Sequence, residues 1–179
     1  MKKKAILAIV SMALVLCCVI GGSLAWLTDK TEEVKNTFTV GDINIDLTES
    51  QDLDLKMVPG NTIKKDPTVT VKADSEACWL FVKVIKSDNF DAFMTYEVDE
   101  GWTALTGETG VYFRQVAATA EDTSFAVLAD DIVTVSSDVT KEQLNALEQA
   151  EYPTLTFKAY AVQKANIADA TTAWGQVSD

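Results

Sequence analysis

Residues 78–85 read Cys-Trp-Leu-Phe-Val-Lys-Val-Ile, which is the most apolar stretch of the chain after its first 25 residues. Only Lys83 interrupts the run. A strand that is half buried alternates apolar and polar side chains, whereas a strand covered on both faces reads as a continuous apolar run. The stretch therefore predicts a central β-strand with apolar layers on both sides.

Shorter strand patterns lie on both sides of this stretch. Residues 38–47 alternate apolar and polar side chains, with a change of phase at Gly41-Asp42, and residues 68–72 and 155–162 alternate in the same way. Further short strands are expected at residues 94–98, 111–116, 124–128 and 132–135. About eight short strands separated by turns predict an all-β fold, either a β-sandwich or a barrel.

One short helix is expected at residues 141–150. Thr140 and Gln143 have the spacing of a capping box, in which each side chain bonds the backbone of the other residue. Leu144 and Leu147 fall on one face, and Pro153 prevents the helix from continuing.

The chain begins with the pattern of a secretory signal peptide, which we expect to be helical. Three lysines precede the apolar run 5–20, and Ser23-Leu24-Ala25 supplies small residues for cleavage between Ala25 and Trp26. The run has 16 residues, whereas a membrane span needs about 20. Cleavage is therefore favoured over a permanent anchor. A lipoprotein is disfavoured, because neither Cys17 nor Cys18 follows a small residue.

Three segments follow from this cleavage point: a signal peptide at 1–25, a mature N-terminal arm at 26–36 and a β-sandwich domain at 37–179. Cleavage changes the formal net charge from −12 to −15, because the leader carries three lysines and no acid. Such a surface disfavours nucleic acids and anionic membranes as partners. A membrane contact is expected only through the uncleaved leader.

The chain contains no histidine, which excludes most hydrolytic sites. Ser-His-Asp triads, Cys-His pairs and H-E-x-x-H zinc sites all need an imidazole. We predict no catalytic residue, no metal ligand and no cofactor. Cys78 is the single cysteine after the leader, so the mature chain has no internal disulfide, and a buried, inert thiol is expected.

The sequence resembles the TasA/camelysin (CalY) group of exported proteins of Gram-positive bacteria, whose leader is removed by the signal peptidase SipW. The residues that carry the resemblance are 21–29, 36–41 and 43–47. Residues 57–60, 79–84, 160–163 and Ala173-Trp174 resemble the wider set of alternate signal-mediated exported proteins. The resemblance implies a jelly-roll-like β-sandwich, cleavage near Ala25 and a place on the cell surface or in the matrix, where some members form biofilm fibres.

The expected function is that of a non-catalytic surface or matrix protein that self-associates, or joins related matrix subunits, after a SipW-type peptidase frees its arm. The arm would add a strand to a neighbouring subunit through Trp26, Leu27, Val34, Phe38 and Val40. A disordered tail is the alternative for residues 26–36. Another class is an adhesin that binds through Trp102 or Trp174. The remote alternative is a camelysin-type metallopeptidase, although this chain lacks a histidine ligand.

Overall fold

The central strand predicted at residues 78–85 is present as β4, Cys78–Lys86, in a computed structural model that describes residues 42–50 and 56–177. All described residues lie in one structural unit, Val40–Asp179. Residues on both faces of β4 are buried, from Cys78 to Val82 and again at Val84. The prediction of a strand covered on both sides is therefore confirmed.

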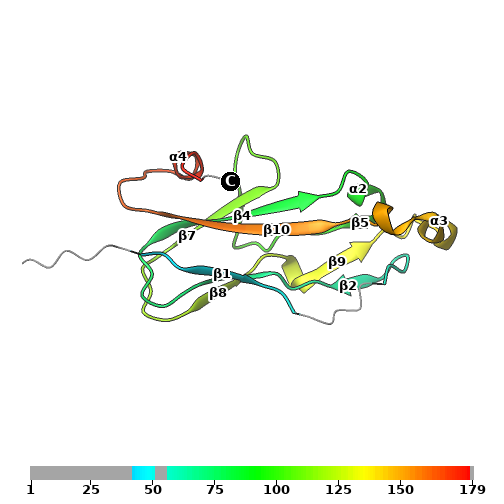
Figure 1. Ribbon diagram of the computed structural model, residues 1–179, viewed down its shortest axis with the longest axis horizontal. Helices are drawn as coiled ribbons and strands as arrows, with labels where there is room; N and C mark the ends of the chain where they lie inside the picture. Colours follow the sequence, from blue (N-terminus) through cyan, green and yellow to red (C-terminus); the bar gives the residue numbers. More distant parts are fainter. Residues whose placement is uncertain (1–41, 51–55, 178–179) are drawn as a thin grey trace, which may run out of the picture. The chain divides into compact units, whose positions relative to one another are not determined.

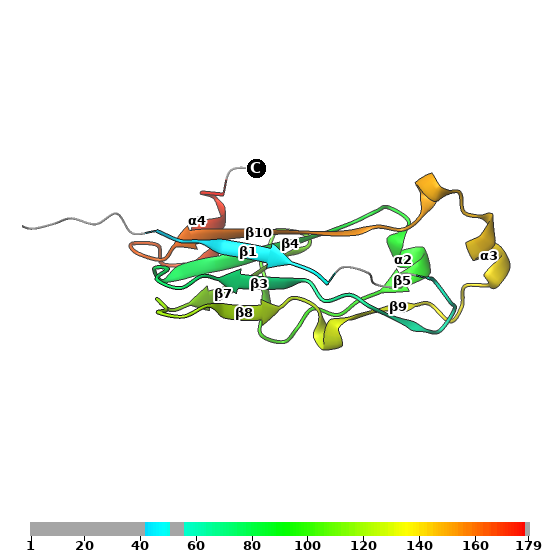
Figure 2. The same ribbon diagram turned by 60° about the horizontal axis from the view of Figure 1, so that its bottom comes forward.

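The described residues form three antiparallel sheets (Figures 1 and 2), which confirms the all-β sandwich class. One sheet has the strand order β10-β4-β7-β6, the second β1-β3-β8 and the third β2-β9-β5. The strands are β1 (Ile45–Thr48), β2 (Thr62–Lys64), β3 (Thr68–Val71), β5 (Met94–Thr95), β6 (Thr103–Ala104), β7 (Val111–Val116), β8 (Thr123–Ala126), β9 (Ile132–Val135) and β10 (Leu155–Gln163).

The two smaller sheets follow one another along the same two chain segments. β2 leads into β3, and β8 leads into β9, so each pair of strands is one extended segment with an interruption. The first interruption includes the buried Pro67, which has no backbone N–H to donate to a ladder. Its carbonyl instead accepts the N–H of Val127 at 2.9 Å, at the second interruption.

The inner face of β4 packs against these sheets. Cys78, Leu80, Val82 and Val84 join Val69 of β3 in a core cluster whose members are almost fully buried. The outer face carries Trp79 and Phe81 and would be exposed without a further layer. Burial of each such side chain stabilises the fold by roughly 1.5–3 kcal/mol, so both faces need a cover.

Helix α4 (Ala170–Trp174) supplies that outer cover. Figure 1 shows α4 over the sheet that contains β4, on the side away from β1 and β8. Ala170 and Ala173 are buried in the same cluster as Trp79 and Phe81. The Asp169 side chain caps the helix by accepting the backbone N–H of Thr172 at 2.8 Å.

The predicted helix at 141–150 is correct at its start and too long at its end. Helix α3 spans Lys141–Ala146, and both bonds of the Thr140–Gln143 capping box are present. Leu147 then has an extended backbone, and a separate 3-10 turn η2 follows at Gln149–Glu151. The sequence analysis also did not predict α2 (Phe90–Phe93), α4 and the 3-10 turn η1 (Ala129–Asp131).

The alternating pattern at residues 38–47 is confirmed where the structure describes it. Ile43, Ile45 and Leu47 are half buried and pack against the core, whereas Asn44 and Asp46 are exposed. The signal peptide at 1–25, the arm at 26–36 and the start of this pattern lie outside the described residues. The predicted division of the chain into these segments stays a prediction.

The turn before β7 needs glycine at a close approach of two strands. Gly107 and Gly110 both have positive φ, +89° and +73°. A Cβ at Gly110 would lie 2.4 Å from the carbonyl oxygen of Val84, whereas a Cβ at Gly107 would meet no atom within 4 Å. The carbonyl of Gly110 also accepts the N–H of Val84 at 2.8 Å, so this contact sets the spacing of β4 and β7.

We expect Gly110→Ala to destabilise the protein much more than Gly107→Ala. Both substitutions place a side chain at positive φ, which costs about 1–2 kcal/mol. The clash with Val84 adds about 1–3 kcal/mol at Gly110 alone, a typical cost of overpacking. Urea unfolding followed by tryptophan fluorescence measures the difference, and equal destabilisation by the two variants would contradict the close approach.

Candidate functional site

An apolar groove of about 860 Å³ lies at the end of the sandwich that carries α3. Its floor is formed by buried side chains of β2, α2, β5 and β9, which belong to one core cluster. The residues that line the groove are Lys56, Met57, Val58, Ile63, Lys65, Phe90, Met94, Val133, Leu144, Asn145, Tyr152, Pro153, Thr154, Leu155 and Thr156. Its size is that of a site for a small ligand or a short peptide segment.

Among the described residues, two strand edges without a partner strand border the groove. β2 is the outer strand of the sheet β2-β9-β5, and β10 is the outer strand of the sheet β10-β4-β7-β6. In an antiparallel pair, every second residue of an edge strand directs its backbone N–H and C=O away from its partner. The edges of β2 and β10 therefore offer backbone donors and acceptors next to the apolar floor.

The groove lies beyond the end of β1, in the direction in which that strand runs. β1 pairs antiparallel with β3 and stops at Thr48, opposite Thr68, which is the first residue of β3. Beyond this point Ser50 is held by Asp66, which accepts its backbone N–H at 2.9 Å and its hydroxyl at 2.6 Å. A strand that continued β1 would lie beside β2, which precedes β3 in the chain. Among residues 42–50 and 56–177, no strand lies in this position, and the groove occupies it.

The rim of the groove exposes apolar side chains. Val58 is 46% exposed and Tyr152 is 49% exposed, and both are among the few large apolar residues on the described surface. Leu144 of α3 also lines the groove. Exposed apolar side chains gathered around a concave surface are typical of a binding site.

The charge of the lining is opposite to that of the chain. Among the described residues that line the groove, Lys56 and Lys65 are the charged ones and none is a carboxylate, although the chain carries 27 acidic residues. The Lys65 ammonium contacts the Glu49 carboxylate at 2.7 Å and lies 5.5 Å from the centre of the Phe157 ring. The charged side chains of the described lining are therefore both cationic, and Glu49 partners one of them.

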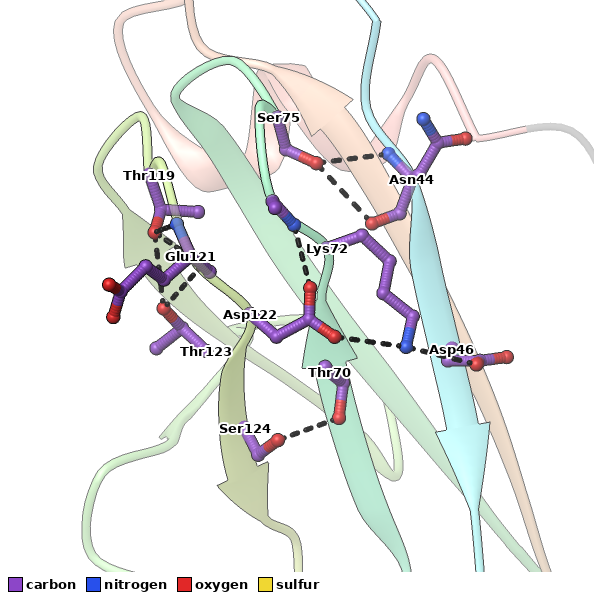
Figure 3. A network of polar contacts seen from close by, with 11 residues as sticks. Asn44, Asp46, Thr70, Lys72, Ser75, Thr119, Glu121, Asp122, Thr123 and Ser124 are labelled. Atoms are coloured by element: carbon purple, nitrogen blue, oxygen red, sulfur yellow. Dashed lines mark hydrogen bonds and ion pairs between the residues drawn. The ribbon is translucent and has the colours of Figure 1, made fainter.

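A polar network fixes the other end of β1 (Figure 3). Lys72 of the β3 side contacts Asp46 of β1 at 3.4 Å and Asp122 beside β8 at 3.2 Å. The Ser75 hydroxyl accepts the backbone N–H of Asn44 at 3.2 Å. The backbone N–H of Ala73 lowers the pKa of Asp122, as does Lys72. These contacts hold the start of β1 against β3 and against the segment before β8.

The predicted cleavage and assembly residues cannot be placed in relation to this groove. Ser23, Ala25, Trp26, Leu27, Val34, Phe38 and Val40 all lie outside the described residues. Sequence reasoning also missed the groove itself, because its lining comes from segments far apart in the chain. The only local signal is the run Tyr152-Pro153 after the helix, which places a large apolar ring on the surface.

The two tryptophans considered for an adhesin pack within the fold. Trp102 is 6% exposed, and its indole N–H donates to the carbonyl of Ala126 at 2.7 Å. The ring of Trp174 lies 5.2 Å from that of Phe81 and 5.5 Å from that of Tyr160. Both side chains therefore hold layers of the fold together.

Residues 1–77 match the family model of camelysin metallo-endopeptidase, which confirms the resemblance to the TasA/camelysin group over this part of the chain. The match is consistent with an exported protein at the cell surface or outside the cell. No curated protein and no solved structure matches the chain. Within the part of the chain that the structure describes, no helix is long and apolar enough to cross a membrane.

The residues of this chain do not fit the metal centre that the family name implies. A zinc ion prefers histidine nitrogen and cysteine sulfur, with carboxylate oxygens as additional ligands. The chain has no histidine, and Cys78, its cysteine outside residues 1–25, is fully buried. Across residues 42–50 and 56–177, no three Cys, Asp or Glu side chains are grouped so that they could hold a metal.

Cys78 is a packing residue in the core of the sandwich. Burial raises the pKa of its thiol to about 11, which keeps the thiol protonated at neutral pH. The thiolate is the reactive form of cysteine, and it is both inaccessible and disfavoured here.

We expect folded protein comprising residues 26–179 to react with dithionitrobenzoate at pH 8 at least a hundredfold more slowly than the same protein unfolded in urea, because its cysteine, Cys78, is buried and protonated. The same shift predicts a pH dependence. The raised pKa stabilises the fold below the ordinary value of 9.0, and this stabilisation is lost as the pH rises through about 11. Rapid labelling of the folded protein would contradict this assignment.

Proposed function

We propose that the protein is an exported, non-catalytic subunit of the cell surface or extracellular matrix that assembles by strand exchange. In this proposal a SipW-type signal peptidase cuts between Ala25 and Trp26. The freed arm, residues 26–36 with the following residues to Val40, then inserts into the groove of a second copy or of a related matrix subunit. Before cleavage, the arm is held at the membrane by the leader and cannot assemble.

The observation that carries this proposal is the position of a missing strand between β2 and β10. An added strand would bond the open backbone edges and bury alternate side chains on the apolar floor, which is how β-augmentation gains affinity and specificity. Val34, Phe38 and Val40 have the even spacing that places their side chains on one face of a strand. Trp26 has the same spacing and would cover more of the exposed rim.

The arrangement of the domain supports head-to-tail assembly. β1 begins at the end of the sandwich opposite α3, and the groove lies at the α3 end (Figures 1 and 2). β1, which follows the arm in the sequence, therefore begins far from the groove of its own subunit. A donor at one end and an acceptor at the other make a heterologous contact, which extends into a filament unless it closes into a ring.

We expect deletion of residues 26–36 to abolish fibres of the mature protein in negative-stain electron microscopy, because the donor strand is removed. A peptide with the sequence of residues 26–40 should then bind the shortened protein and raise its melting temperature by several degrees, as any ligand of the folded state does. A peptide of the same composition in reversed order is the matched control. Unchanged fibres after the deletion would contradict strand exchange.

The purified mature protein should not cleave casein in the presence of zinc, because the chain lacks a histidine ligand and a grouped set of donors among its described residues. The measurement is release of soluble peptides over a day, with a zinc endopeptidase as the positive control. Cleavage that a chelator abolishes would contradict the non-catalytic role.

A further inference from the structure

We propose that the groove is also a binding site for a medium-chain fatty acid, with the alkyl chain on the apolar floor and the carboxylate at Lys65. This site is separate in function from strand exchange and does not depend on it. Since both occupants use the same groove, a bound fatty acid would exclude the incoming strand.

The interior of the groove favours an alkyl chain. Ile63, Phe90, Met94 and Val133 form a floor that is at least 92% buried, with no charged atom among their side chains. Met57 adds a second flexible thioether to the lining, and methionine adapts its shape to irregular apolar ligands. A groove of about 860 Å³ is within the range of roughly 300–1,000 Å³ that accommodates small ligands.

The charges at the groove favour an anionic head group. Lys65 lies at the end of β2, where its backbone N–H donates to the carbonyl of Asp131 at 2.7 Å. Its side chain is only 16% exposed, so a carboxylate bound to it would be partly shielded from water. Bonds between an ammonium and a carboxylate are stronger than neutral hydrogen bonds, and partial burial strengthens them further.

Glu49 now occupies the position that the ligand carboxylate would take. Its carboxylate lies 2.7 Å from the Lys65 ammonium and is 34% exposed. The ligand must therefore displace Glu49 or share the lysine with it. Removal of the Glu49 charge should increase the affinity of the groove for an anion. A non-specific apolar surface would show no such increase.

Non-specific binding to this protein should favour cations over anions. The mature chain has a formal net charge of −15, so long-range attraction favours cationic amphiphiles everywhere on the surface. A preference for an anion over a cation with the same alkyl chain cannot come from the overall charge. It requires the local positive charge of Lys65.

The test is calorimetric titration of the mature protein, residues 26–179, with laurate and with dodecyltrimethylammonium, both below their micellar concentrations. We expect one laurate per chain and at least tenfold weaker binding of the cation. Leu144→Glu should weaken laurate binding at least tenfold, because it places a carboxylate in the lining. Leu147→Glu is the matched control, because Leu147 is also half buried near the end of the α3 segment but lies outside this groove.

Two further variants test the head group. Lys65→Met should remove the preference for the anion, whereas Glu49→Gln should tighten laurate binding about threefold and leave the binding of the cation unimproved. Absence of saturable laurate binding, equal binding of the two amphiphiles, or equal effects of Leu144→Glu and Leu147→Glu would overturn the proposal. Binding is read from heats and not from fibres, so failure of strand exchange would leave this test intact.

Discussion

The burial of β4 on both faces is the constraint on which the rest of the structure depends. Its inner face needs the sheet that contains β3 and β8, and its outer face needs α4. β7 and β10 occupy both of its edges along most of its length, with pairs from Leu155 opposite Lys86 to Gln163 opposite Cys78 on the β10 side. β4 therefore has a partner strand on each side. The edge strand of its sheet next to the groove is β10.

The groove follows from how the opposite layer is interrupted. Pro67 separates β2 from β3, and β1 pairs only with β3, so β2 keeps an open edge. The Asp66 carboxylate holds Ser50 at this interruption. Among the described strands, β3 has a partner on both sides, whereas β2 has a partner only on the β9 side. The groove lies on the unpaired side of β2, and its lining consists largely of apolar residues that an added strand would cover. An extended peptide and an alkyl chain are two chemically different ways to cover the same surface.

Local features of the fold could be predicted from the sequence, whereas the groove could not. Seven of the eight residues at 78–85 are apolar, which identifies β4, and the Thr140–Gln143 pair identifies the start of α3. The end of α3 was missed because Leu147 continues the helical pattern although its backbone is extended. The groove could not be predicted, because its lining combines residues from segments that are far apart in the sequence. The camelysin match ends at residue 77, directly before β4. It therefore covers the groove residues between 56 and 65, and it does not cover those of β9, α3 or β10.

Hydrogen exchange of the assembled protein against the monomer tests the central claim most directly, because strand insertion protects specific backbone amides. The account predicts new protection in peptides that cover residues 62–65 and 155–157, at the two open edges beside the groove, and little change at the edge strand β8, Thr123–Ala126. Protection at β8 with none at β2 and β10, or assembly without new protection at any strand edge, would contradict it.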